Sequence, residues 1–260
     1  MSRKYTFDNE SNILSYYRTL KEKPLGFPQS DDLWRIYQST IDDEAWKKWR
    51  NTSGKSDVPP DFVNHEAHIM MEVMRFDDQA KNSGKTNEAK AKENRTLNEF
   101  NKSGIFDVFP NVREIHINSP TDLNTNDDHN YKRFQENFNR VVTKHSKKSI
   151  QYRLNYPMYK LVFFVFDESS GVYFETNETI KVKINMNIIA APHFYWIDQF
   201  IVETIKNCGA DYLIWFKPYN SFRTPSGTND DFPKVIIYDV KNMKLETKNY
   251  DCDLMFSSEI

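Results

Sequence analysis

Asp61 and Glu72 are two acidic side chains whose positions in the sequence call for a chemical explanation. Glu72 lies in the apolar run IMMEVMRF, residues 69–76, which is typical of a β-strand. Side chains alternate along a strand, so Glu72 shares a face with Met70 and Met74. An ionised carboxylate is costly to bury alone. Glu72 is therefore expected to be paired with a basic side chain, protonated or bound to a metal.

A second carboxylate is expected next to Glu72. Pro59 and Pro60 favour an extended backbone, which predicts a short strand at residues 61–63 and places Asp61 on a neighbouring strand. Mg²⁺ takes hard oxygen ligands, commonly one or two carboxylates completed by water and phosphate. Such a cation polarises a phosphate and lowers the pKa of an attacking water. The two acids therefore suit the hydrolysis of a phosphodiester.

The whole chain, residues 1–260, is expected to form one α/β domain. It is 38% hydrophobic and 15% aromatic, which is enough for a large core, and no Gly/Ser-rich or Pro-rich linker divides it. The net charge is −2, so a nucleic-acid surface would have to be a local patch. The sequence shows no signal peptide or membrane span, and its two cysteines form no zinc pattern. A cytoplasmic protein without membrane contact is expected.

Hydrophobic periodicity predicts the order of the elements. Helices are expected at residues 30–50, 129–148 and 194–209. Strands are expected at residues 61–63, 69–76, 112–117, 159–167, 179–189, 210–218 and 233–241. The polar segment 77–102 is interpreted as an insertion, and residues 171–260 as a C-terminal extension of the sheet.

Between residues 30 and 167 the predicted order is helix, three strands, helix, strand. Together with Pro60-Asp61 and with Glu72 eleven residues later, this order resembles the PD-(D/E)xK nuclease superfamily. The resemblance implies a mixed central sheet flanked by helices, with a restriction-endonuclease-like αβββαβ core at residues 30–167. It also implies a Mg²⁺-dependent nuclease acting on DNA or RNA, in which Asp61 and Glu72 bind the metal and are catalytic.

The motif departs from the family pattern at Met74. The family's lysine is expected two positions after the acid, so this chain has ExM in place of ExK. Arg75 points to the opposite face of a regular strand and could substitute only through a bulge. Lys160, at the beginning of the last core strand, is another candidate for the missing cation. Both an active nuclease and a nuclease-fold protein without catalysis are compatible with this motif.

Further candidate residues lie on the predicted helices. A helix acid supplies a third metal ligand in some relatives of this fold, and Glu44 would be that acid here. Glu44 could equally complement a helix N-terminus. Lys144, Lys147, Lys148 and Arg153 form the densest basic cluster and are expected to contact nucleic-acid phosphates. A solvated helix end explains this cluster about as well.

A non-enzymatic protein-interaction module, of a bacterial or phage family, is the alternative function. The missing lysine and the near-neutral charge favour it, and the aromatic segments HFYWIDQF and DYLIWFKPY, residues 193–200 and 211–219, would then engage a protein partner. On this interpretation a basic side chain holds Glu72. Two carboxylates close together in an open cleft would favour the nuclease; separate capping by Lys or Arg would favour the alternative. The sequence specifies no oligomeric state.

Overall fold

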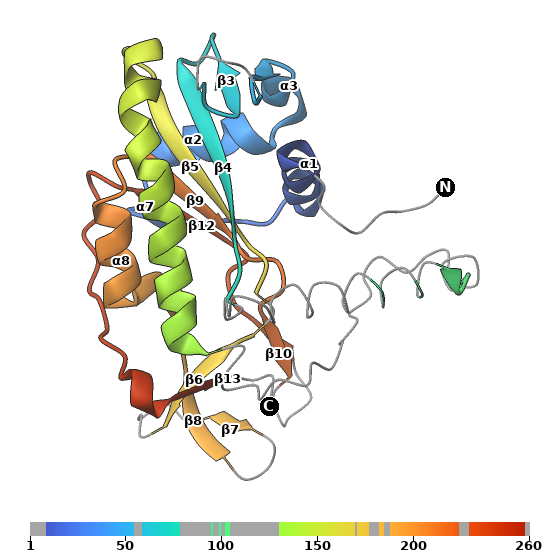
Figure 1. The fold of residues 1–260 in the computed structure, drawn as a ribbon, viewed down its shortest axis with the longest axis vertical. Helices are drawn as coiled ribbons and strands as arrows, with labels where there is room; N and C mark the ends of the chain where they lie inside the picture. Colours follow the sequence, from blue (N-terminus) through green and yellow to red (C-terminus); the bar gives the residue numbers. More distant parts are fainter. Residues whose placement is uncertain are drawn as a thin grey trace.

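The computed structural model describes residues 9–54, 59–78, 95, 99, 102–104, 130–169, 171–176, 182–184, 188–223 and 229–257. Within them the chain forms a mixed seven-stranded sheet with helices on both faces, a sheet of four strands and a two-stranded ribbon (Figure 1). The expected α/β class, with a mixed sheet flanked by helices, is confirmed. The strand predicted at residues 112–117 and most of the segment 77–102 lie outside the described residues.

The elements before residue 79 are α1 (Glu10–Leu20), β1 (Leu25–Phe27), α2 (Asp31–Ile41), α3 (Asp43–Trp46), β2 (Trp49–Asn51), β3 (Phe62–Asn64) and β4 (Ile69–Phe76). Those that follow it are α7 (Tyr131–Asn155), β5 (Lys160–Asp167), β6 (Tyr173–Thr176), β7 (Val182–Ile184), β8 (Ile188–Pro192), η1 (Tyr195–Ile197), α8 (Gln199–Lys206), β9 (Tyr212–Phe216), β10 (Ser221–Arg223), β11 (Asn229–Asp231), β12 (Val235–Asp239), η2 (Cys252–Leu254) and β13 (Met255–Ser257).

The large sheet has the strand order β1-β12-β9-β5-β4-β3-β2. Strands β2, β3 and β4 are consecutive antiparallel neighbours, and β5 returns parallel to β4 after α7. β9 is parallel to β5, while β12 is antiparallel to β9 and parallel to β1. Strands β9 and β12 come from the C-terminal third of the chain and widen this sheet. The four-stranded sheet, in the order β13-β6-β8-β7, lies at one end of the molecule (Figure 1).

Two hydrophobic layers cover the two faces of the large sheet. Helices α7 and α8 pack on the face that carries Met70 and Met74, and α1 and α2 pack on the face that carries Met71 and Val73. This alternation is the one expected for a strand at residues 69–76. Glu72 therefore faces α7, and it is only 2% exposed.

Helix α7 is fixed to the sheet by aromatic packing. Phe138 stacks on Trp215 of β9, with ring centroids 4.5 Å apart, and Phe134 and Phe138 both contact Phe76 of β4. These side chains recur on one face of the helix that hydrophobic periodicity predicted at residues 129–148. Burial of several large aromatic side chains makes α7 a rigid platform for the side chains beside them.

The predicted helix at residues 30–50 is wrong at its C-terminal end. α2 ends at Ile41, and Asp42 adopts an extended backbone in which its side chain caps the short helix α3. Trp49 then begins strand β2 and stacks on Trp46 at 5.9 Å. A spacing of three residues between the tryptophans is compatible with one continuous helix and also with a helix followed by a strand. The Asp42 cap ends the first helix and begins a new short one, so the second arrangement is found.

Three other boundaries differ from the expectation. Helix α7 runs seven residues beyond residue 148, to Asn155. The predicted helix at 194–209 is a 3₁₀ turn followed by α8, because Asp198 caps a new helix. The single strand predicted at 179–189 is wrong, since this part of the chain forms two strands, β7 and the beginning of β8, which pair antiparallel.

Candidate functional site

Glu72 is held by basic side chains from α7. Its Oε1 accepts a hydrogen bond from Nδ1 of His145 at 2.7 Å and one from Nζ of Lys148 at 3.1 Å. Tyr152 adds a further hydrogen bond to this carboxylate. His145, Lys148 and Tyr152 are spaced three and four residues apart, so they share one face of the helix. The buried acid in the apolar strand is thus explained by pairing across the sheet–helix interface, with a basic partner of the kind that the interaction-module alternative expects.

Asp61 lies directly before β3 and close to the backbone of Glu72. Its Oδ2 accepts a hydrogen bond from the amide of Val73 at 2.8 Å. Because β3 and β4 are antiparallel neighbours, this contact brings the two carboxylates to the same part of the sheet. Asp61 and Glu72 therefore lie near each other, Asp61 directly before β3 and Glu72 within β4.

The two acids differ in pKa. Burial, and next the charge of Glu72, raises the pKa of Asp61 to about 7. Burial would also raise the pKa of Glu72, but the hydrogen bond from His145 and the charge of Lys148 hold it below its usual value. At neutral pH, therefore, Glu72 is ionised and Asp61 is close to half protonated. A carboxyl group whose pKa is raised, next to an ionised carboxylate, marks a position where an added cation would be favourable.

Glu44 does not contribute to this pair. It lies in α3, is exposed and forms an ion pair with Lys47 at 2.5 Å, as expected of a charge near a helix N-terminus. Another helix acid acts on the pair instead, because the charge of Glu10 also raises the pKa of Asp61. Glu10 is in the first turn of α1, which Asn9 caps. The Asn-Glu pair at a helix start is the sequence signal that could have suggested it.

Met74 occupies the position at which the family's lysine is expected, and neither Arg75 nor Lys160 replaces it beside Glu72. Met74 is buried among the apolar side chains that face α7. Arg75 pairs with Glu168, and the unbroken register of β4 with β5 leaves no bulge to redirect it. Lys160 contacts the hydroxyl of Tyr212 at 3.3 Å. The cation beside Glu72 therefore comes from α7 and is Lys148.

The predicted nucleic-acid cluster separates into three environments. Lys148 belongs to the carboxylate site, and Arg153 donates to the backbone oxygen of Gly209 and to Asp211. Lys144 and Lys147 are exposed on the outer face of α7. Lys148 and Arg153 are paired with acids but stay partly exposed, at 40% and 39% of their side chains, and Lys144 and Lys147 are exposed.

Asp61 and Glu72 fit a magnesium ion by donor type. Among the residues that the structure describes, no group of three or more His, Cys, Asp or Glu side chains is placed to hold a metal. Mg²⁺ is commonly bound by one or two carboxylates with water and substrate phosphate. The two acids supply such oxygens; burial first, and next the charge of Glu72, raises the pKa of Asp61.

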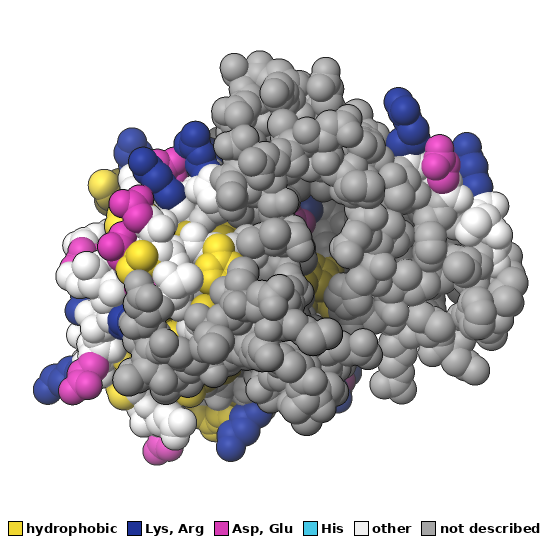
Figure 2. Space-filling model, turned by 90° about the horizontal axis from the view of Figure 1, so that it is seen from below, with side chains coloured by type: hydrophobic (Ala, Val, Ile, Leu, Met, Phe, Trp, Pro, Cys, Tyr) yellow, Lys and Arg dark blue, Asp and Glu magenta, His cyan; other side chains and the backbone are white. Residues whose placement is uncertain are grey.

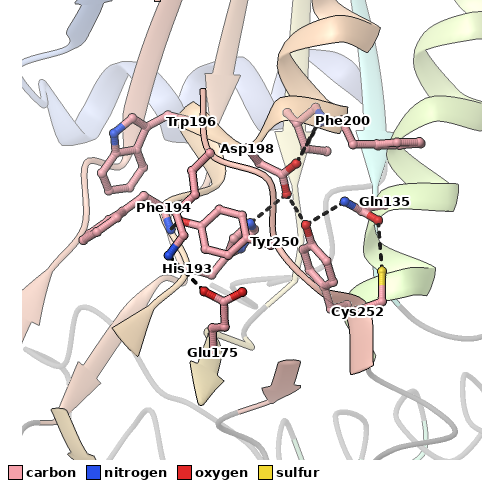
Figure 3. A network of polar contacts seen from close by, with 12 residues as sticks. Gln135, Glu175, His193, Phe194, Trp196, Asp198, Phe200, Tyr250 and Cys252 are labelled. Carbon is pink, nitrogen blue, oxygen red and sulfur yellow. Dashed lines mark hydrogen bonds and ion pairs between the residues drawn. The ribbon is translucent and has the colours of Figure 1, made fainter. Parts of the chain in front are cut away.

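A second buried polar network joins α7, α8 and the C-terminal segment (Figure 3). Oδ2 of Asp198 accepts hydrogen bonds from Nε2 of His193 at 2.8 Å and from the hydroxyl of Tyr131 at 2.6 Å. Gln135 extends it to Cys252. Burial lowers the pKa of His193, while the pKa of Asp198 is lowered, against the effect of its own burial, by its hydrogen bonds. This network was not anticipated from the sequence, because its members are far apart in the chain.

A third cluster lies at the carboxyl ends of the parallel strands. Asp167 is fully buried at the end of β5, accepts a hydrogen bond from the indole of Trp215 at 3.1 Å and lies 3.3 Å from Nζ of Lys217. Ser169 donates its amide back to Asp167, which is the geometry of a turn. Residues 167–169 therefore form a turn, and Lys217 lies within ion-pair distance of the buried acid.

The described surface shows no single sign of charge at the end that carries the four-stranded sheet. Basic and acidic side chains lie side by side around the described part of that face, with hydrophobic ones between them (Figure 2). The aromatic segment 211–219 is mainly the buried strand β9, so it offers little surface to a partner. No helix in the described ranges is both long and apolar enough to cross a membrane.

Comparison with known proteins assigns the chain to no group: no protein-family model, no curated protein and no solved structure matches it.

Proposed function

We propose that this chain is a Mg²⁺-dependent nuclease of the PD-(D/E)xK type in which Lys148 takes the place of the missing motif lysine. The observation that carries the proposal is the meeting of Asp61, Glu72 and Lys148, from the beginning of β3, the middle of β4 and α7. In metal-assisted phosphodiester hydrolysis, carboxylates can hold the cation and a basic side chain can stabilise charge on the phosphate. Here Asp61 accepts from the amide next to Glu72, and Lys148 donates to Glu72.

The order of the elements around the site supports the resemblance. A helix precedes three antiparallel strands, β2, β3 and β4, and α7 then leads to β5, which is parallel to β4. Among the described elements this corresponds to the αβββαβ order only with β2 as the first of the three strands, in place of the strand predicted at residues 112–117, which lies outside the described residues. Asp61 stands at the beginning of the middle strand and Glu72 within the third.

Each side chain has a role that its contacts suit. Asp61 and Glu72 would hold the Mg²⁺, which when bound polarises the phosphate and makes water more acidic. Lys148 is 40% exposed at its side chain, so its ammonium can reach both Glu72 and a phosphate at the surface. It would stabilise negative charge that develops on the phosphate oxygens. His145 keeps Glu72 ionised and oriented. Lys144 and Lys147 would contact the backbone of DNA or RNA.

The function is tested by divalent-ion binding and cleavage measured on the same proteins. Mg²⁺ or Mn²⁺ titration by calorimetry, and cleavage of single-stranded and double-stranded DNA and RNA, are compared for the wild type and Glu72→Gln. We expect Glu72→Gln to lose both metal binding and metal-dependent cleavage while retaining its circular dichroism spectrum. Glu44→Gln is the matched control, and we expect it to behave as the wild type.

Cleavage that persists in Glu72→Gln would contradict the assignment. Metal binding without cleavage of any substrate would instead indicate a nuclease-fold protein that has lost catalysis. Absence of metal binding in the wild type, with and without substrate oligonucleotide, would favour the interaction module, in which Lys148 and His145 serve only to neutralise Glu72.

A further inference from the structure

Four aromatic side chains lie together where the turn between β3 and β4 meets the end of α7. His65 and His68 belong to that turn and are exposed, whereas Tyr156 and Tyr159 directly follow α7 and are half-buried. The ring centroids of the two tyrosines are 5.4 Å apart. The ring of Tyr159 also lies 6.0 Å from that of His65 and 5.0 Å from that of His68. These four residues form the ring cluster.

The ring cluster is held in place by hydrogen bonds and by packing. Nδ1 of His65 lies 3.0 Å from the hydroxyl of Tyr159, at hydrogen-bond distance. Within the turn, the side chain of Asn64 accepts a hydrogen bond from the amide of Ala67 at 3.0 Å. Tyr156 and Tyr159 also pack against the hydrophobic core on the α7 side of the sheet. Because the rings are ordered in advance, a planar ligand that stacks on them loses less free energy to ordering.

The ring cluster lies along the same helix and strand as the carboxylate site. His145 contacts Glu72, and the ring of Tyr156 lies 6.2 Å from that of His65, so α7 runs antiparallel to β4. The end of α7 and the turn between β3 and β4 accordingly lie at the same end of the molecule (Figure 1). Glu72 comes four positions after His68, which is roughly 13 Å of strand. A nucleic-acid strand of about four stacked nucleotides spans that distance.

The charges near the ring cluster suit the backbone of a nucleic acid. Lys148 and Arg153 keep 40% and 39% of their side chains exposed although each is paired with an acid. Lys160 is exposed directly after Tyr159. The acid of the turn, Glu66, is paired with Lys48 at 2.5 Å. Basic side chains that contact phosphates, next to rings that stack on bases, are the usual means of binding single strands.

We propose that the ring cluster stacks on the unpaired bases of a single-stranded nucleic acid whose backbone crosses the carboxylate site. This inference rests on the proposed function and adds the class of substrate, which is a single strand in preference to a duplex. In a duplex the faces of each base are covered by its neighbours, so they cannot reach the rings, whereas an unpaired base can turn toward them. Every base has such a face, so DNA and RNA strands share this chemistry.

Fluorescence anisotropy with labelled strands of about 12 nucleotides, with Ca²⁺ as the divalent ion, tests the inference. We expect single-stranded DNA or RNA to bind the wild type at least about tenfold more tightly than a duplex of the same length. The double variant His65→Ala/His68→Asn should lose about tenfold in affinity for single strands and keep its affinity for the duplex. Asparagine is chosen because residue 68 has a φ of 54°, which asparagine tolerates. Trp34→Ala is the matched control, because this 47% exposed ring lies on α2, on the opposite face of the sheet.

A ring-restoring variant separates stacking from damage to the turn. His65→Phe/His68→Asn keeps an aromatic ring without the hydrogen bond to Tyr159, and we expect it to recover most of the lost affinity. Tighter binding of either the DNA or the RNA strand would identify the source of the bases and support the proposal. Equal affinity for single strands and duplex, no binding of single strands, or unchanged binding by the double variant would overturn it.

The two proposals can fail separately. Metal-dependent cleavage of a duplex that is unaffected by His65→Ala/His68→Asn would leave the proposed function standing and overturn the preference for single strands. Single-strand binding that depends on the rings, without cleavage of any substrate, would support the ring cluster as a base-binding surface and contradict nuclease activity.

Discussion

Nζ of Lys148 lies 3.1 Å from Oε1 of Glu72, although the two residues are 76 positions apart in the chain. The strand position at which a motif lysine is expected holds Met74, which is buried, and the cation arrives from the helix that crosses the strand. A cationic group can therefore be supplied to this acid without a lysine on the same strand.

Lys148 can be tested against its neighbour Lys147, which is exposed one position away on α7. We expect Lys148→Met to lower metal-dependent cleavage by about a hundredfold or more, because charge stabilisation at the phosphate is lost. Lys147→Met should lower substrate affinity modestly and leave the rate at saturation unchanged. Steady-state cleavage assays that separate the two parameters make the comparison. Equal effects of both variants would argue against a special role for Lys148.

Binding of a divalent ion should depend on pH through Asp61. The pKa of this carboxyl is raised to about 7 by burial and by the charge of Glu72, so the ion must displace a proton below that pH. We expect the affinity for Mn²⁺ to be about tenfold weaker at pH 6 than at pH 8. Calorimetric titration across this range measures it. A pH-independent affinity would mean that Asp61 is not a ligand.

Asp61 should also make the apoprotein less stable as the pH rises. Its pKa in the folded state is above that of the unfolded chain, so stability is highest below about pH 4 and is lost as the pH approaches 7. Asp61→Asn removes this loss, and we expect it to be more stable than the wild type by about 1–3 kcal/mol at pH 8 and nearly equal at pH 4. Urea unfolding at both pH values provides the test; destabilisation at pH 8 would refute the expected sign.

Glu10 and Glu44 form a matched pair for testing which helix acid acts on the site. The charge of Glu10 raises the pKa of Asp61, whereas Glu44 pairs with Lys47. We expect Glu10→Gln to lower the pKa of Asp61, measured by carbon-13 NMR of its carboxyl group, and Glu44→Gln to leave it unchanged. A pKa of Asp61 that changes in Glu44→Gln and not in Glu10→Gln would instead identify Glu44 as the helix acid that acts on the site.

The network around Asp198 is expected to be structural. Asp198→Ala would leave His193 and the hydroxyl of Tyr131 without their buried acceptor, and we expect it to destabilise the fold by about 2–4 kcal/mol. Tyr131→Phe removes one hydrogen bond and should cost about 1 kcal/mol. Urea unfolding measures both. The proposed nuclease activity, measured at low temperature, should survive each change, and its selective loss would point to a catalytic role.

Local pattern determined a large part of this structure. The alternation of residues 69–76 placed Glu72 on one face of a strand, the apolar run at 159–167 specified a buried strand, and the aromatic spacing of residues 131–145 specified the core face of α7. These signals are short-range, because they come from the periods of a strand and of a helix. They also identified Asp61 and Glu72 as neighbours, since only one tight connection separates their strands.

The partners of Glu72 were decided by the tertiary structure alone. Nothing in the spacing of Glu72 and Lys148 indicates that α7 crosses β4 at the point where His145 and Lys148 can reach the acid. The same holds for Glu10, which approaches Asp61 only because α1 packs on the other side of the sheet. Contacts between residues far apart in sequence depend on how the layers pack, so composition and periodicity predict which side chains are buried and the fold decides which of them meet.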